Sequence, residues 1–408
     1  MAVPPEAVAS GAGAATPVKP AVAVAGGVEG SAAHAEAFGS RGDEARALLM
    51  QRMKADWCGF GAAENERQRE AVMQRAQDKQ GSVGVEAIQE MRATPGAQVV
   101  EEAVAQVRQR WVKALMQRGD PRAVAVAEFL GGRDGDALQA RARLQALART
   151  TSDPMVTALA LQRPCEAGAC TNVEASQWSR LEPANLQAWL TLLSSPKVGA
   201  RQTLAGYVLE RVAGEARYSR TYEREFRAML LSLPQTETPG LANDAEMQLV
   251  LGTAGAWNIA GFRPLMEACR SGMGDAASAH RCATVADLMW DQDDLLDRTM
   301  ALSLARRLVA AMPAQKVRWE PRAMQSEAVW SWINAAAERA EQSPSAGGSP
   351  CDSQAEQRAA MQARVALGEW GLARAQMRAG KADDAALSAD WRRGQGRSML
   401  DPEAAPAR

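Results

Sequence analysis

The chain has 408 residues, of which 47% are hydrophobic and 23% are charged, and its 47 Lys and Arg residues nearly balance its 48 Asp and Glu residues. This is the composition of a soluble globular protein, and the lack of a basic excess disfavours nucleic-acid binding. No stretch approaches the roughly 18–20 apolar residues of a membrane-spanning helix. Good helix formers dominate and strictly alternating β-branched runs are absent, so the sequence predicts an all-α fold.

The first 40 residues differ in composition from the rest of the chain. Of these residues, 29 are Ala, Gly, Pro or Val, which cannot build a core and predict a disordered tether over residues 1–40. The segment lacks the charged start, apolar core and cleavage site of a signal peptide, which favours the cytoplasm. Because such tethers often join a folded domain to another element, an upstream export or anchor segment is the alternative. Only 7 of the 47 basic residues are Lys, which indicates GC-rich coding and a bacterial source.

Helical signals are nearly continuous beyond residue 40. Residues 43–57 open with acidic side chains, which the helix dipole favours. Residues 97–119 carry apolar side chains three or four positions apart, which is the stripe of an amphipathic helix. Short helices are expected between residues 121 and 271, and longer ones between residues 277 and 379. Most connections are short, so successive helices should be antiparallel neighbours.

We therefore predict antiparallel helix pairs that stack as an α-solenoid or an irregular helical array. The helical repeat domain is expected over residues 41–341. Residues 342–350 are rich in Ser, Pro and Gly and predict a flexible break. A C-terminal helical segment over residues 351–392 and a disordered tail over residues 393–408 complete the chain.

Residues 181–192, with the sequence LEPANLQAWLTL, combine the signals for a helix end and a helix start. Pro183 cannot continue the preceding helix, and Asn185 can cap the next one. Trp189 should then pack back over the turn, with Leu192 three residues further on. This arrangement resembles the junction between two tetratricopeptide units. The resemblance implies a helical repeat and protein–protein binding, and it assigns no binding residue.

The six cysteines are an even number, compatible with three disulfides. Cys165 and Cys170 flank a turn that contains Gly168, and Cys269 and Cys282 lie on apolar faces on either side of a hairpin loop. We favour a disulfide in each of these local pairs, with buried free thiols as the alternative. Cys58 and Cys351 would form a third pair by elimination alone. Because disulfides need an oxidising compartment, this reading favours the periplasm or cell envelope over the cytoplasm.

No catalytic, cofactor-binding or metal-binding motif is recognisable. Glycine-rich phosphate loops, a serine nucleophile elbow and Cys-x-x-Cys zinc spacing are missing from the sequence. The acidic run at residues 291–297 lacks the central Gly and the final Glu of a calcium loop, so it predicts the acidic start of a helix. We therefore expect no catalytic residue, cofactor, metal ligand or nucleic-acid partner.

Two classes of function remain open. The first is a non-catalytic helical repeat domain that acts as a protein–protein interaction scaffold, in the bacterial cell envelope, with a protein partner of unknown identity. The second is a helical hydrolase, for example one acting on cell-wall glycan, with carboxylate chemistry in a groove. The lack of any motif favours the first class. A groove lined by carboxylates with shifted pKa values would favour the second.

Overall fold

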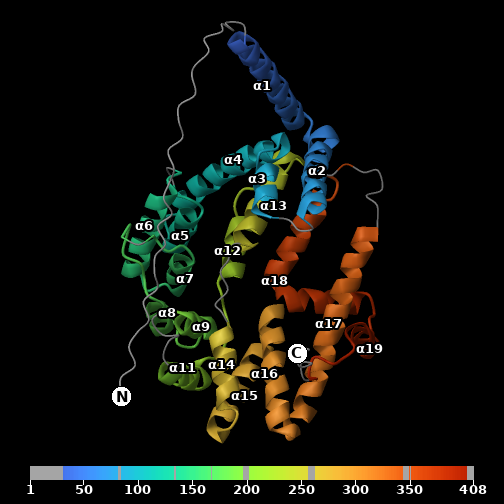
Figure 1. Ribbon diagram of the computed structural model, residues 1–408. Helices are drawn as coiled ribbons and strands as arrows, with labels where there is room; N and C mark the ends of the chain where they lie inside the picture. The colour runs from blue at the N-terminus through green and yellow to red at the C-terminus, as the bar shows by residue number, and fades with distance from the viewer. Residues whose placement is uncertain are drawn as a thin grey trace, which may run out of the picture. The chain divides into compact units, whose positions relative to one another are not determined.

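The structure is a computed structural model that describes residues 31–80, 84–132, 135–166, 168–195, 202–255, 262–342, 349 and 351–401. The chain divides into two compact units, residues 1–49 and 50–408. The described part of the first unit belongs to helix α1 (Ser31–Ala55). The second unit holds the remaining elements (Figure 1). It also holds both hydrophobic cores. The residues described contain helices and no strands, as the sequence predicts.

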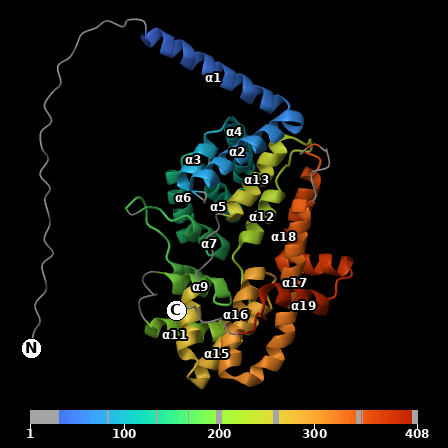
Figure 2. The same ribbon diagram turned by 45° about the vertical axis from the view of Figure 1, so that its right-hand side comes forward.

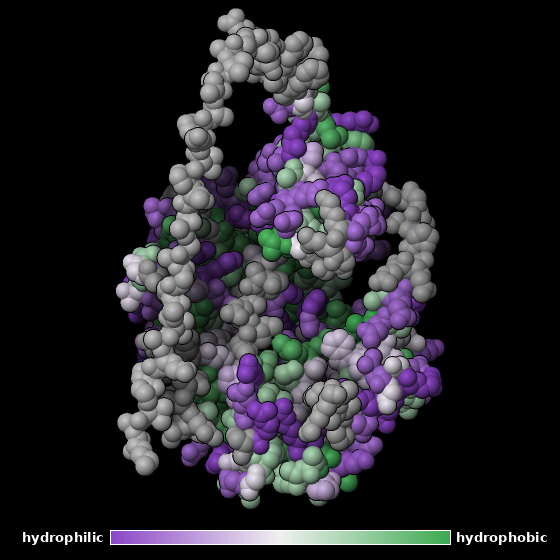
Figure 3. All heavy atoms as spheres, in the orientation of Figure 1, coloured by the Kyte–Doolittle hydropathy of each residue, from purple (hydrophilic) through white to green (hydrophobic). Residues whose placement is uncertain are grey.

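Short helices make up the N-terminal part of the second unit, together with the long helix α4. After a π-helical turn, Trp57–Gly61, come α2 (Ala62–Gln80), α3 (Val85–Arg92), α4 (Pro95–Arg118), α5 (Pro121–Phe129), α6 (Ala137–Thr150) and α7 (Pro154–Gln162). Hydrophilic side chains cover α2 (Figure 3), as the polar composition of this helix requires. Helix α4 begins after a Thr94 cap with Pro95 as its first residue, and Gly119 with φ 69° ends it. These are common residues for the start and the end of a helix.

The central part of the chain continues with short helices and ends in an antiparallel pair. These elements are α8 (Ala175–Leu181), α9 (Leu186–Ser194), α11 (Gln202–Glu215), α12 (Glu223–Leu231), α13 (Leu241–Gly255), α14 (Arg263–Gly272), α15 (Ala276–Trp290) and α16 (Leu295–Ala311). Helix α13 packs against α4, and α15 packs against α16. The acidic run at residues 291–297 does open a helix, because Asp294 caps α16 by accepting hydrogen bonds from the N–H groups of Leu296 and Asp297.

Two long helices and a shorter one follow toward the C-terminus. A 3-10 turn, Pro313–Gln315, precedes α17 (Lys316–Gln342), and α18 (Gln354–Ala379) and α19 (Asp384–Gln395) follow. Helix α19 lies beside α17 in both views (Figures 1 and 2). Helix α18 bends at Gly368, whose φ of 71° and ψ of 169° are not helical. The all-helical architecture of packed pairs is therefore present.

Two hydrophobic clusters stabilise the second unit. The first is built mainly from α4, α5, α6, α7, α12 and α13, and it surrounds the fully buried side chains of Trp111, Leu144 and Phe226. The second is built mainly from α9, α11 and α14–α17, and Trp319 is buried at its centre. Helices α8 and α9, which contact each other, contribute to different clusters through Trp178 and Trp189. The junction between these two helices therefore connects the two cores.

The predicted tether, break and tail each fall partly on residues that the structure describes. Residues 31–40 of the expected tether are the start of α1, whereas residues 1–30 lie outside the described residues. Of the expected break at 342–350, the described residues are Gln342, which ends α17, and Ser349.

The expected disordered tail at 393–408 is corrected for residues 393–401. Helix α19 continues to Gln395, and Leu400 is buried in the second cluster. The reason is the buried carboxylate of Glu327, which accepts hydrogen bonds from the Ser398 hydroxyl at 2.7 Å and the Met399 N–H at 2.8 Å. A buried carboxylate needs such donors. Residues 402–408 lie outside the described residues.

Candidate functional site

The site begins at the junction between α8 and α9. Helix α8 ends at Leu181, one residue before Glu182 and two before Pro183, and α9 begins after an Asn185 cap. Trp189 is 5% exposed, and its indole N–H donates to the Pro183 carbonyl at 2.8 Å. Leu192 packs, half-buried, against the second hydrophobic cluster. The helix end, the cap and the returning tryptophan therefore lie where the sequence predicts them.

Glu182 is the polar centre of this junction. Its buried carboxylate accepts hydrogen bonds at one oxygen from the indole of Trp178 (2.8 Å) and the amide of Asn185 (2.9 Å). The other oxygen accepts from the hydroxyls of Tyr218 (2.8 Å) and Tyr222 (2.7 Å). Burial, together with the hydrogen bond to Glu182, raises the pKa of Tyr218 to about 12 and raises that of Tyr222 further. Neutral donors thus satisfy all of this carboxylate's hydrogen-bonding demand.

Asn185 attaches the loop between α11 and α12 to the junction. Its side-chain oxygen accepts from the Arg220 N–H at 2.9 Å, and its amide donates to the Arg220 carbonyl at the same distance. The Leu186 N–H also donates to the Tyr218 carbonyl at 2.8 Å. Residues 218–222 are therefore fixed to the start of α9 through their backbone as well as through Glu182.

A second set of contacts connects this loop to the turn between α15 and α16. The Ser219 N–H donates to the side chain of Gln292 at 2.9 Å. The amide of Gln187 donates to the Ser219 hydroxyl at 2.9 Å and to the Asp297 carboxylate at 3.3 Å. The loop is consequently held from two sides, by α9 and by the turn that precedes α16.

A cleft of about 390 Å³ lies between three parts of the chain. They are the loop before α12 with the first turns of α12, the turn between α15 and α16 with the start of α16, and the bend of α18. Arg224 joins two of its walls, because its guanidinium donates to the carbonyls of Val365 and Ala366, each at 3.0 Å. The bend requires glycine at position 368, since a Cβ there would lie 2.6 Å from the Cβ of Asp293 and φ is positive. The charged residues that line the cleft are Arg220, Glu223, Arg224, Glu225, Arg227, Asp293, Asp294, Asp297, Arg364 and Glu369.

Two carboxylates of the cleft have raised pKa values. Burial raises the pKa of Asp297 to about 7, and the neighbouring charge of Asp294 adds to the rise. Burial also raises the pKa of Glu223, against the opposing effect of its ion-pair partner Arg227. Burial lowers the pKa of Arg364, as does the nearby positive charge of Arg227. The cleft thus places an acid that titrates near neutrality among charges of both signs.

The arrangement has two chemical capabilities. Paired guanidinium and carboxylate groups along the rim can bind complementary charges on a polypeptide. Asp297, with a pKa near 7, has the property of a general acid or base. However, its carboxylate already accepts the hydrogen bond from Gln187, a contact that fixes α9 against α16. Its environment is therefore also that of a buried contact between helices.

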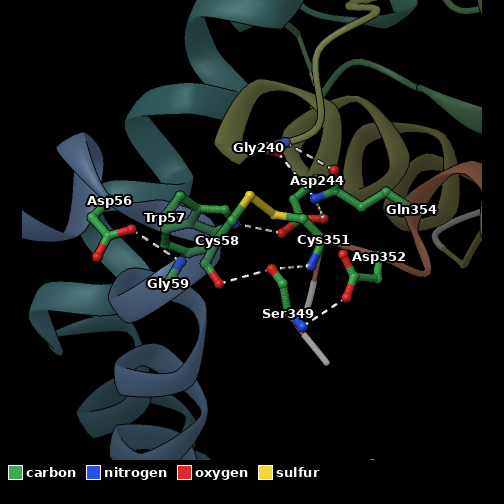
Figure 4. Close-up of a disulfide and its surroundings, with 10 residues drawn as sticks. All are labelled: Asp56, Trp57, Cys58, Gly59, Gly240, Asp244, Ser349, Cys351, Asp352 and Gln354. Atoms are coloured by element: carbon green, nitrogen blue, oxygen red, sulfur yellow. Dashed lines mark hydrogen bonds between the residues drawn. A yellow bond between two sulfur atoms is a disulfide. The ribbon is translucent and has the colours of Figure 1, made fainter. Parts of the chain in front are cut away.

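The disulfide between Cys58 and Cys351 joins the start of the second unit to the segment directly before α18 (Figure 4). Its Cα atoms lie 5.4 Å apart across a sequence separation of 293 residues. The Ser349 hydroxyl donates to the Cys58 carbonyl at 2.9 Å. Beside it, Asp244 of α13 accepts from the indole of Trp57 at 2.6 Å and from the amide of Gln354 at 2.5 Å. Hydrogen bonds therefore accompany the covalent connection.

The two local disulfides are present as well. Cys165 and Cys170 close a short loop, and the side chain of Asn172, two residues after it, accepts from the Cys165 N–H at 2.8 Å. Cys269 and Cys282 are fully buried and join α14 to α15. All three pairs expected from the sequence are bonded, so the alternative of buried free thiols is not what the structure shows. Three disulfides suggest an oxidising compartment outside the cytoplasm.

The sequence predicts the junction and the cysteine pairs, but it does not predict the cleft. Tyr218, Ser219 and Tyr222 carry no recognisable motif, and they lie 33 or more positions after Asn185 in the chain. Asp297 was expected only as part of an acidic helix start. Glu182, directly before Pro183, is the signal in the sequence that could have indicated these contacts. A carboxylate at a buried helix end needs hydrogen-bond donors from other parts of the chain.

None of the described helices has the length and apolarity needed to cross a membrane. Comparison of the chain with protein-family models, with curated proteins and with solved structures finds no match.

Proposed function

We propose that this chain is a non-catalytic helical scaffold that binds a partner protein in an oxidising extracytoplasmic compartment, the bacterial periplasm or cell envelope. The observation that carries the proposal is the charged cleft next to the α8–α9 junction. Its walls come from three separated parts of the chain that are held together by hydrogen bonds. Its rim presents both guanidinium and carboxylate groups, which suits complementary recognition of a polypeptide.

Two further features support this proposal. Residues 181–192 resemble a tetratricopeptide junction in the placement of Pro183, Trp189 and Leu192, and that family binds proteins. The helices also pack in pairs, and the three disulfides reinforce connections between them. A scaffold needs a rigid framework rather than a moving one, because binding to a preorganised surface avoids the cost of ordering it.

Site-specific photo-crosslinking in the native host tests this function. A photo-crosslinking amino acid replaces Glu225, which lines the cleft, or Glu101, which is exposed on α4 and does not line it. We expect a discrete crosslinked protein from position 225 and none of that mass from position 101. Identical products from the two positions, or no product from position 225, would contradict the scaffold proposal.

A helical hydrolase is the second candidate, and the pKa of Asp297 is the observation that favours it. Glycan hydrolysis commonly uses one protonated and one ionised carboxyl group, and Asp297 shares the cleft with Asp294 and Glu223. Release of soluble fragments from purified cell-wall glycan, abolished in Asp297→Asn and retained in the surface variant Asp390→Asn, would establish this function in place of the scaffold. Equal release by both variants would exclude Asp297 as its acid.

A further inference from the structure

A second cleft, also of about 390 Å³, lies among α4, α5, α6, α7 and α13 and shares no lining residue with the first. Its base is apolar, because the buried side chains of Val112, Phe129, Leu130 and Leu249 line it. Its volume falls within the range of small-molecule sites, which combine an apolar lining with a few polar groups. The nature of those polar groups indicates what the cleft can bind.

Three guanidinium groups converge on this cleft from different elements. Arg108 comes from α4, Arg141 from α6 and Arg163 from the residue that ends α7. Within the described part of the chain, none of the three forms an ion pair with a carboxylate. The one described carboxylate in the lining, Glu128, is paired with Arg143 at 2.8 Å. The cleft therefore carries a concentration of positive charge that its described residues leave unbalanced.

Arg163 is held in place before any ligand arrives. Its guanidinium carbon lies 4.5 Å from the centre of the Phe129 ring, and its buried Nε has no hydrogen-bond partner among the residues that the structure describes. Its carbonyl accepts from the amide of Gln145 at 3.1 Å, which fixes the backbone. Burial lowers the pKa of Arg163, and the positive charges of Arg141 and Arg108 lower it further. A half-buried cation with no counter-charge among the described residues is destabilised by desolvation, so an anion at this position would be stabilising.

We propose that this second cleft binds a small organic anion whose phosphate or carboxylate group is held by Arg108, Arg141 and Arg163. Planar guanidinium groups match the geometry of both oxyanions and can bind them through paired hydrogen bonds. The apolar part of the ligand rests against Phe129 and Leu249. This site is independent of the proposed scaffold role, because no residue of the charged cleft contributes to it.

Calorimetric titration of the full-length, disulfide-bonded protein tests the proposal with three probes. Phenyl phosphate and benzoate carry the two oxyanions on the same apolar ring, and phenol carries the ring without the charge. We expect one or both anions to bind at a single site and phenol not to bind. The arm with the tighter binding identifies the phosphate or the carboxylate as the preferred group.

Substitutions then assign the binding to this cleft. Arg108 is exposed and Arg141 half-buried, so Arg108→Gln and Arg141→Gln should leave the fold intact, as circular dichroism can verify. Each should weaken binding about tenfold or more, because each removes a charge-assisted hydrogen bond to the anion. Arg149→Gln is the matched control, because it removes the same charge from an exposed position of α6, the helix that carries Arg141.

The proposal is overturned if neither anion binds at millimolar concentration, or if phenol binds as tightly as the anions. It is also overturned if the Arg108 and Arg141 variants bind like the Arg149 variant.

Discussion

The hydroxyl of Tyr222 donates a hydrogen bond to the buried carboxylate of Glu182 at 2.7 Å, across 40 positions of the chain. Tyr222 stands directly before α12 with a φ of 68°, in the left-handed region that side chains bearing a Cβ rarely adopt. Its ring is buried against Trp178 at a centroid distance of 6.3 Å. Burial and the hydrogen bond thus offset the cost of this backbone conformation, which is about 1–3 kcal/mol. Because Tyr222 lines the charged cleft, this hydrogen bond helps to hold one wall of the cleft in place.

Removal of the Glu182 carboxylate should therefore destabilise the protein. In Glu182→Ala, four donors lose their acceptor, and the hydrogen bonds from Trp178, Asn185 and Tyr222 are buried. Each unsatisfied buried donor costs about 1–3 kcal/mol, so we expect a loss of at least about 2 kcal/mol in the free energy of unfolding measured by denaturant titration. Glu210→Ala, on the exposed surface of α11, is the control. A Glu182 effect as small as the control's would contradict the assigned network.

Trp189 should be a major contributor to stability at the same junction. Its side chain is buried in the second cluster and its indole N–H is bonded to the Pro183 carbonyl. Trp189→Ala should lower the free energy of unfolding by about 3–5 kcal/mol, the usual cost of removing a buried large aromatic side chain. Trp189→Phe, which loses the hydrogen bond but keeps most of the packing, should cost less. A loss below about 1 kcal/mol in the alanine variant would show that the contact contributes little.

Features with a local cause were predictable from the sequence, whereas those assembled from distant segments were not. Pro183 and Asn185 act on the residues next to them, so the end of α8 and the start of α9 could be placed. Cys165 and Cys170 are also local. Cys58 and Cys351 could be paired only by elimination, because no local geometry relates residues 293 positions apart.

The charged cleft and the ordered C-terminal segment also depend on contacts between distant parts of the chain, so the sequence did not predict them. Asp297 lies at a helix start, where an acidic residue is normal, and only tertiary packing buries it among the contacts of α9. Residues 398–400 have the composition of a tail, yet they pack because Glu327, 71 positions before Ser398, needs donors. Neither partner reveals this demand by itself, since the burial that creates it is a property of the fold.

The raised pKa of Asp297 should appear in the pH dependence of stability. A carboxyl group whose pKa rises from 3.8 to about 7 on folding binds its proton more tightly in the folded state. Its contribution to the free energy of unfolding is therefore fully present below pH 3.8 and is lost as the pH rises through 7. The loss is on the order of a few kcal/mol, since each pKa unit corresponds to about 1.4 kcal/mol.

Asp297→Asn, which stays neutral at every pH, should remove this dependence. We expect the variant to be more stable than the wild type at pH 8 and to show a flatter stability profile between pH 4 and pH 8, as measured by urea unfolding. Asp390→Asn, which changes an exposed carboxylate on α19, should keep the wild-type profile. A wild-type profile in Asp297→Asn would assign the titration to another group.

The cysteines should be oxidised in the native host. Alkylation of the non-reduced protein followed by mass spectrometry should show no modified cysteine, because all six belong to disulfides. After reduction under denaturing conditions, the same procedure should modify all six, which verifies that the reagent reaches them. Six modified cysteines without reduction would contradict an oxidising compartment, since cytoplasmic thiols stay reduced.

The three disulfides should differ in how much they stabilise the fold. In the chain-entropy model the gain increases with the length of the closed loop, and the sequence separation is 293 for Cys58–Cys351 against 5 for Cys165–Cys170. The long connection also keeps Trp57 near Asp244, and Gln354 near the same carboxylate. We therefore expect Cys58→Ser/Cys351→Ser to cost about 5–6 kcal/mol and Cys165→Ser/Cys170→Ser about 2 kcal/mol, measured by denaturant unfolding. If the short loop proved the more stabilising of the two, the contacts around Asn172 rather than loop entropy would govern these contributions.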